Sequence, residues 1–101
     1  MKRGELWTVV PLDHPKPRPA VILSVDTWNA HALDVIVVPL TTQPGPSRPE
    51  IRHADLRRPT YAKCGGMGTL PKSHLKQRIG HVDEQTLDRI GFELRRLLSL
   101  G

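Results

Sequence analysis

The sequence has very little cysteine, few aromatic residues and no long apolar run. Cys64 is the single cysteine, so no intramolecular disulfide can form and a disulfide-rich secreted framework is excluded. No apolar stretch approaches the length of a membrane span, and the basic residues Lys2 and Arg3 are not followed by the apolar run of a signal peptide. We therefore expect a cytoplasmic protein that is not inserted in a membrane.

The low aromatic content, 4% of the chain, means that the core must consist mainly of Val, Ile, Leu and Ala. The 101 residues fit a single domain, 1–101, with a modest core. Small domains often gain stability by association, so a homodimer is expected from size alone. The 15 Lys and Arg against 10 Asp and Glu give a net charge of +5. This charge favours a phosphate backbone or an acidic protein as partner, unless the protein is merely basic.

The pattern of apolar residues predicts a mainly β fold with one clear helix. Asp83 is a good N-cap, and the apolar residues that follow recur at helical spacing, which predicts an amphipathic helix over 83–99. β-forming runs and proline-rich loops occupy most of the rest of the chain. We expect a small, strongly bent antiparallel sheet or partly open barrel whose open side the helix covers. The predicted strands are 5–10, 20–25 and 33–40, with weaker candidates at 50–53, 60–64 and 69–70; the loops are 11–19 and 41–49, and short helical turns are predicted near 26–29 and 71–75.

Several kinds of chemistry are disfavoured by the spacing of the reactive residues. No two histidines are separated by three or four positions and Cys64 has no cysteine neighbour, so neither a metal site nor another cofactor is predicted. The glycine stretch 65–68 lacks the lysine and hydroxyl residue of a phosphate-binding loop, and a structural turn is the better interpretation. Lone cysteines are usually buried apolar residues, so Cys64 is not predicted to be a nucleophile. The histidines are His14, His31, His53, His74 and His81.

Two polar clusters stand beside the strongest predicted strands. Arg18 leads into the second strand, and Thr41 and Thr42 follow the third. Neighbouring strands could bring both clusters to the same rim of the sheet. Simpler interpretations stay open, because Arg18 could be an ordinary surface charge and the threonines could cap a turn.

Four segments, in order along nearly the whole chain, resemble the MazF/PemK family of toxins. The opening Arg3–Trp7 is similar to the family's Arg-Gly-acid-Leu-Trp start, and Arg18–Ser24 is similar to its Arg-Pro-Ala strand. Asn29 fits an asparagine that follows a few residues later, and Val38–Thr42 matches a Val-Pro-Leu-Thr-Thr motif. The segment before the final helix, Lys72–Leu75 and Arg78–Gly80, also looks like the family pattern. Each motif alone is weak, but four in the right order are specific.

The resemblance implies an SH3-like small barrel of the CcdB/PemK type with a C-terminal helix, forming a homodimer. It also implies the toxin of a type II toxin–antitoxin system, a metal-independent and sequence-selective endoribonuclease that cleaves single-stranded mRNA. In such a reaction the 2′-hydroxyl attacks the adjacent phosphorus and leaves a 2′,3′-cyclic phosphate and a 5′-hydroxyl. Carried over by motif, the catalytic arginine falls on Arg18 and the catalytic threonine on Thr41.

Further residues are expected to contact the RNA, and a protein partner is expected to compete with it. The implied partner is a cognate antitoxin whose acidic, partly disordered segment would occupy the same basic groove. The RNA-binding candidates, chosen for their charge and their places in loops, are His14, Lys16, Thr42, Arg48 and Lys63.

The chain departs from the family at two places. The loop before Arg18 is compact and rich in proline, without the usual Glu-Gln pair. Where the family usually reads Asp-Gln followed by a basic residue, this chain reads Gly65-Gly66-Met67-Gly68. A relative that binds RNA or antitoxin without cutting is therefore one alternative. A CcdB-like toxin acting on DNA gyrase is another, although the Arg18 and Thr41 matches speak against it.

Overall fold

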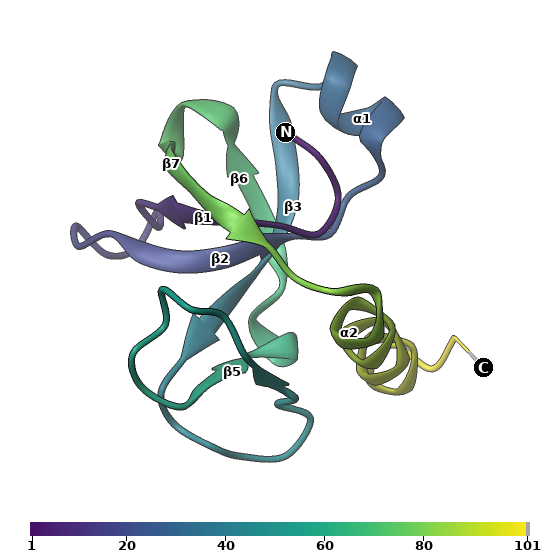
Figure 1. Ribbon diagram of the computed structural model, residues 1–101. Helices are drawn as coiled ribbons and strands as arrows, with labels where there is room; N and C mark the ends of the chain where they lie inside the picture. Colours follow the sequence, from purple (N-terminus) through teal and green to yellow (C-terminus); the bar gives the residue numbers. More distant parts are fainter. Residues whose placement is uncertain (101) are drawn as a thin grey trace.

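The computed structural model describes residues 1–100, which form a strongly curled antiparallel sheet flanked by two helices (Figure 1). In chain order the elements are β1 (Glu5–Val9), β2 (Arg18–Ile22), α1 (Asp26–His31), β3 (Asp34–Thr41), β4 (Glu50–Ile51), β5 (Thr60–Ala62), the 3-10 turn η1 (Cys64–Gly66), β6 (Gly68–Pro71), the 3-10 turn η2 (Lys72–His74), β7 (Leu75–His81) and α2 (Glu84–Leu97). Within residues 1–100, no helix is long and apolar enough to cross a membrane.

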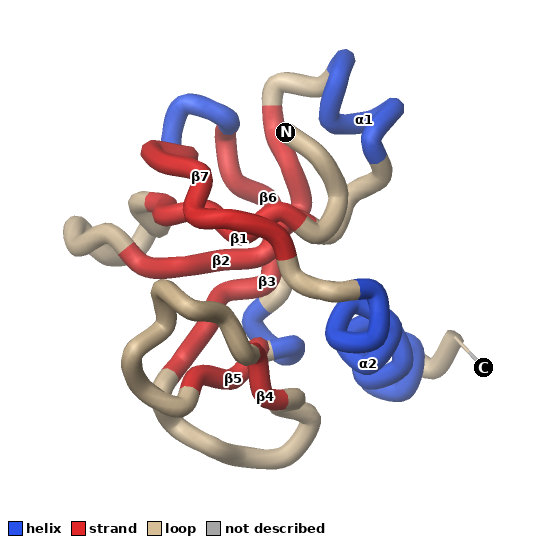
Figure 2. The backbone as a smooth tube through the Cα atoms, in the orientation of Figure 1, coloured by secondary structure: helices blue, strands red, loops and turns tan. Residues whose placement is uncertain are grey.

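The sheet curls because β3 is long and pairs with two different strands along one of its edges. Its first half pairs with β6 and its last two residues pair with β5, while β2 pairs with it on the other side. The strand order is therefore β6-β3-β2-β1-β7. Its two outer strands, β6 and β7, follow each other in the chain and are joined by η2. The result is a half-barrel, whose strands are drawn in red in Figure 2, and it confirms the predicted fold class.

Both faces of the sheet are buried, which explains the continuous apolar run in β2. Val21 belongs to a cluster that lies between the sheet and α2, with Leu87 and Ile90 from the helix. Ala20 and Ile22 point the other way, into a second cluster on the concave face of the half-barrel. Alternate residues of a strand face opposite sides, so a strand buried on both sides must be apolar throughout.

Helix α2 forms as the sequence predicts. The Asp83 side chain accepts a hydrogen bond from the backbone N–H of Thr86 at 2.7 Å, and this bonding holds the pKa of the Asp83 carboxyl below its ordinary value. Leu87 and Ile90 are buried, whereas Leu97 and Leu98 at the end of the predicted apolar face are about half exposed. The helix is therefore anchored mainly by its first half.

Three elements differ from expectation. The second strand was expected over 20–25, but β2 ends at Ile22 because Ser24 accepts a backbone hydrogen bond from Ile36 and bonds to Asn29 instead. Of residues 71–75, Lys72–His74 form the 3-10 turn η2, whereas Pro71 ends β6 and Leu75 begins β7, so no α-helix starts there. Strand β7 was missed, since its polar sequence has no alternation. It forms because its backbone pairs with β1, across two register shifts.

Candidate functional site

Arg18 and Thr41 lie at the same rim of the sheet. Strands β2 and β3 are antiparallel, and their pairing ends with Ala20 opposite Pro39. Arg18 and Thr41 lie two residues beyond this pair, and both line the same two surface hollows. The sequence predicted that neighbouring strands could bring these polar clusters to the same rim, and in the structure Arg18, Thr41 and Thr42 all line one hollow.

Two surface hollows meet at this rim. The larger has a volume of about 460 Å³ and the smaller about 370 Å³, and Arg18, Leu40 and Thr41 line both of them. Lys63 and the turn at Gly66 contribute to the larger hollow. Thr42 contributes to the smaller one. Arg18 and Thr41 therefore form a saddle with a recess on either side, a shape that suits an extended chain passing over it.

The remaining predicted RNA-binding residues lie elsewhere on the surface. His14 and Lys16 are exposed in the loop between β1 and β2, where the Lys16 N–H donates to His14 Nδ1 at 3.1 Å, and neither lines the two hollows. Arg48 lines a third hollow of about 760 Å³ between the 43–49 loop and α2, and its Nη1 donates to the Gln43 carbonyl at 2.9 Å. Arg48 is thus set apart from the saddle, whereas His14 and Lys16 belong to the loop whose residue Asp13 lines the larger hollow.

Three polar residues at the two hollows were not singled out from the sequence. Asp13 and Thr69 line the larger hollow, and Thr60 lines the smaller one. Asp13 sits in a loop whose path cannot be read from its sequence. The threonines reach the site only because β5 and β6 both pair with β3, and such long-range pairing leaves no local signal.

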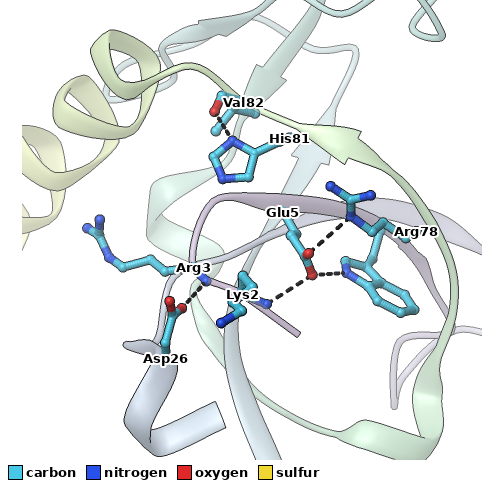
Figure 3. Close-up of polar contacts among 8 residues, drawn as sticks. Lys2, Arg3, Glu5, Asp26, Arg78, His81 and Val82 are labelled. Carbon is cyan, nitrogen blue, oxygen red and sulfur yellow. Dashed lines mark hydrogen bonds and ion pairs between the residues drawn. The ribbon is translucent and has the colours of Figure 1, made fainter. Parts of the chain in front are cut away.

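The opening Arg3–Trp7 motif has a structural role in this chain. Gly4 has a φ of +90°, and its backbone makes hydrogen bonds with the backbones of both Ile22 and Val82. It therefore connects the start of β1 to the end of β2 and to the segment after β7. The next residue, Glu5, is buried, and Figure 3 shows its carboxylate as the centre of three interactions. The backbone N–H of Lys2 and the indole N–H of Trp7 each donate to Oε1 at 2.9 Å, and Arg78 Nε lies 3.0 Å from Oε2.

This network predicts an acid-sensitive stability. Burial raises the pKa of Glu5, but the hydrogen bonds from Trp7 and Lys2 and the nearby positive charges, Arg78 among them, more than offset it, so the pKa lies below its ordinary 4.5. Because the pKa of Glu5 is lower in the folded than in the unfolded chain, its carboxylate stabilises the fold at pH values above the unfolded-state pKa. This stabilisation is lost as the pH falls through the folded-state pKa. Glu5→Gln should therefore lower the free energy of unfolding at neutral pH by on the order of 1–3 kcal/mol.

Urea unfolding at neutral pH and at several acidic pH values measures this difference. The wild-type and Glu5→Gln curves should converge in acid, because the wild-type carboxylate is then protonated. Asp34→Asn, which changes an exposed carboxylate, is the control and should shift stability little at any of these pH values. Parallel wild-type and Glu5→Gln curves at all pH values would contradict the assignment.

Asn29 also has a structural role. It is buried, its Nδ2 donates to the Ser24 carbonyl at 2.8 Å, and its Oδ1 accepts from the Ser24 hydroxyl. The pair fixes the turn from β2 into α1, on which the position of β3 depends.

Cys64 is buried in the cluster beneath α2, as the sequence predicts, and is not a surface nucleophile. Burial, assisted by the nearby Glu93 charge, raises the pKa of its thiol to about 11. Native protein at mildly alkaline pH should therefore react very slowly with a thiol-specific reagent such as dithionitrobenzoate, and unfolded protein should react fully. Rapid reaction of the native protein would show that the site is open.

Among residues 1–100, no three His, Cys, Asp or Glu side chains are grouped so that they could hold a metal ion.

Known proteins with a similar sequence or fold were found for this chain. A family model described as the PemK-like, MazF-like toxin of type II toxin–antitoxin systems matches residues 2–98. An endoribonuclease in complex with its cognate antitoxin, from a Mycobacterial species, is 26% identical with a TM-score of 0.85, and the match covers 100% of this chain and 97% of that one. No curated protein matches the chain.

Two more distant structures share the fold. The Mycobacterium tuberculosis toxin MazF-mt6 is 21% identical with a TM-score of 0.85, over 96% of this chain and 98% of that one. The MazE-MazF structure from Deinococcus radiodurans is 18% identical with a TM-score of 0.83, over 100% and 98%. Because the family model spans nearly the whole chain, the protein belongs to the PemK-like, MazF-like family of type II toxin–antitoxin toxins.

Proposed function

We propose that this toxin is an endoribonuclease that cleaves single-stranded RNA at the saddle formed by Arg18 and Thr41. The observation that supports the proposal is that Arg18 and Thr41, at the ends of two neighbouring strands, both line each of the two hollows. The similar Mycobacterial structure is named an endoribonuclease, which supports the same activity here. The proposed place of action is the cytoplasm.

The proposed reaction takes its nucleophile from the substrate. The 2′-hydroxyl gives its proton to solvent water and attacks the adjacent phosphorus, the bond to the 5′-oxygen breaks, and that oxygen takes up a proton from water. The products are a 2′,3′-cyclic phosphate and a 5′-hydroxyl. Negative charge builds up on the phosphoryl oxygens during attack, so preorganised donors at the saddle should accelerate the step.

The two residues suit different parts of this task. The Arg18 guanidinium is a planar fork that can donate to two phosphoryl oxygens and stays charged at all relevant pH values, so we assign it charge stabilisation and not proton transfer. The Thr41 hydroxyl can donate one further hydrogen bond to the phosphate. Both lie on regular strands, which hold them more firmly than a loop would.

The flanking nucleotides are proposed to run through the two hollows. Lys63 in the larger hollow and Thr42 in the smaller one are placed to contact the backbone on either side. His14 and Lys16 in the β1–β2 loop, and Arg48 beside α2, stay predictions for longer RNA that extends beyond the saddle.

Two partners are proposed with this function. A cognate antitoxin would place an acidic segment over the basic saddle and exclude RNA, in keeping with the relatives whose structures are named as toxin with antitoxin. A homodimer would extend the RNA-binding surface across two copies. Equilibrium sedimentation of the purified toxin, alone and with its antitoxin, measures both assemblies.

One observation favours a second candidate function, RNA binding without cleavage. The stretch Gly65-Gly66-Met67-Gly68 stands where the resemblance to the family would place an acidic and a basic residue, and its Gly66 and Gly68 line the larger hollow. The saddle would then hold RNA with fewer groups available for proton transfer.

The chemistry of the product ends decides between these functions. Purified toxin is incubated with a mixed single-stranded RNA pool in excess EDTA, with the same RNA annealed to its complement as the control. We expect cleavage of the single strand only, with 5′-hydroxyl ends that polynucleotide kinase can label and 2′,3′-cyclic phosphates. Retarded but intact RNA in a native gel would assign binding alone, and cleavage that requires a divalent ion would overturn the mechanism.

A further inference from the structure

The Thr41 hydroxyl is itself held by a hydrogen bond. The backbone N–H of Gln43, two residues further along the chain, donates to Thr41 Oγ1 at 3.1 Å. A hydroxyl has one hydrogen to donate and two lone pairs that accept. Because the Gln43 N–H occupies one lone pair, the hydroxyl hydrogen points away from that N–H and is available to another acceptor. The turn after β3 therefore orients the group that the proposed reaction uses.

Arg48 holds the other polar group of Gln43. Its Nη1 donates to the Gln43 carbonyl, and a bond from a charged donor is stronger than one between neutral groups. The stem of Arg48 passes close to Gly45, where a Cβ would stand 3.3 Å from Arg48 Cδ. Arg48 thus closes the loop across its own backbone, and Gln43 is held at both its carbonyl and its N–H.

The loop that carries these contacts is anchored at both ends and stiff between them. At its start Thr41 pairs with Tyr61, and at its end the Pro49 carbonyl accepts a hydrogen bond from the Ala62 N–H at 2.9 Å. Three prolines lie within residues 43–49 and restrict the backbone there. In so short and stiff a segment, a contact at one end determines the backbone position at the other.

Helix α2 supports the loop just before Arg48. Arg96 Nη2 donates to Ser47 Oγ at 3.4 Å, and Ser47 has a φ of +56°, in the left-handed region that side chains other than glycine rarely adopt. The surroundings of Ser47 must hold this conformation. The side chain of the next residue, Arg48, then returns across the loop to Gln43.

We propose that Arg48 is a positioning residue, which holds the Gln43 carbonyl so that the Gln43 N–H fixes the Thr41 hydroxyl for donation to the phosphate. The inference rests on the proposed ribonuclease function, because it gives Thr41 a task in that reaction. Without the Arg48 contact the loop relaxes and the Thr41 side chain is free to rotate. A misplaced donor stabilises the transition state less, even where the substrate still binds.

Arg48 is not placed to contact RNA at the saddle. It lines the hollow between the 43–49 loop and α2, and it lines neither of the two hollows that Arg18 and Thr41 share. A short RNA that covers only the saddle therefore tests the positioning role apart from any contact that Arg48 makes with longer RNA.

The test uses a matched pair of arginine variants of the full-length protein. Arg48→Met keeps an unbranched stem beside Gly45 but removes the donor. Arg89→Met makes the same change at an exposed arginine of α2 that lines the same hollow. Cleavage of a short single-stranded RNA is measured in single turnover. Binding is measured by fluorescence anisotropy with the same RNA carrying 2′-O-methyl groups, which cannot be cleaved.

We expect Arg48→Met to slow cleavage about tenfold while the Kd for the uncleavable RNA changes by less than about twofold. Arg89→Met should leave both quantities nearly unchanged. An unchanged rate in Arg48→Met would overturn the inference. So would weaker binding with a salt dependence reduced by about one counterion, since this would assign Arg48 to an RNA phosphate.

A double-mutant cycle with Thr41→Ala tests the route through Thr41. Thr41→Ala alone should slow cleavage. Adding Arg48→Met to it should slow cleavage no further, because the hydroxyl that Arg48 positions is already absent. Losses that multiply in the double variant would show that the two residues act independently and would overturn the inference.

Nuclear magnetic resonance of the threonine methyl groups tests the inference without any cleavage. The three-bond couplings of the Thr41 methyl carbon report its χ1 rotamer, and Thr41→Ala identifies its signal. We expect one rotamer in the wild type and in Arg89→Met, and averaged couplings in Arg48→Met. This result with a wild type that cuts no RNA would keep the positioning role and reject the ribonuclease. An unchanged single rotamer in Arg48→Met would overturn the inference even where RNA is cut.

Discussion

Replacing Arg18 with alanine should lower the rate of RNA cleavage by about 100-fold or more, the usual effect of removing one preorganised donor from a charge-stabilising site. Arg18 is the first residue of β2, which pairs with β3, and it lines both hollows with Thr41. No other arginine or lysine lines both hollows within residues 1–100.

Single-turnover cleavage of a fluorescent single-stranded RNA measures this effect. Arg18→Lys should recover only a part of the lost rate, because an ammonium keeps the charge but cannot bind two oxygens as a fork. Arg52→Ala removes a charge of the same kind that is exposed and paired with Glu50, and it should leave the rate nearly unchanged. Undiminished cleavage by Arg18→Ala would refute the proposed role.

The Arg18 substitution should not affect folding, which makes the result interpretable. The side chain is exposed, so its loss opens no cavity in the core. The circular dichroism spectrum and the unfolding midpoint of Arg18→Ala should match those of the wild type. A large loss of stability would point to a structural role for Arg18.

Replacing Ile90 with alanine should lower the free energy of unfolding by about 2–5 kcal/mol, a large part of the stability of a small domain. Ile90 is fully buried where α2 packs on the sheet, in one cluster with Leu6 and Val21. Truncation there loses apolar burial and leaves a cavity that the sheet, buried on both sides, cannot easily close.

Phe92 provides the comparison on the same helix. Its side chain is 59% exposed, so Phe92→Ala removes a larger group yet should cost far less stability than Ile90→Ala. Chemical denaturation of both variants measures the difference. Similar losses for the two would mean that Phe92 is covered in solution, as an interface of a dimer or an antitoxin complex would cover it.

The sequence was most informative where structure is local. Helix α2 was predicted because its cap, Asp83, and its buried face, Leu87 and Ile90, are close together in the chain. Strands β1 and β3 were predicted nearly to the residue for the same reason. Strand β7 was missed because its polar residues give no apolar pattern, and only the backbone of β1 makes it a strand.

For the candidate site, the sequence identified the residues but not their surroundings. Arg18 and Thr41 could be paired in advance, since consecutive strands of a small sheet are usually neighbours. The hollows on either side depend on segments far apart in the chain, such as the loop at Asp13 and the turn at Gly66. Their meeting place is set by the curl of the sheet, which no single segment encodes.

By itself, the sequence determined a basic, mainly β domain of this toxin family, with one amphipathic helix and with Arg18 and Thr41 beside its strongest strands. Those features follow from composition, local propensity and motif order. Only the tertiary structure separated Arg48 from the saddle and opened a recess at Gly68. It also gave the Arg3–Trp7 motif a structural role through the contacts of Glu5. These are properties of contacts between distant segments, and they exist only once the sheet has curled.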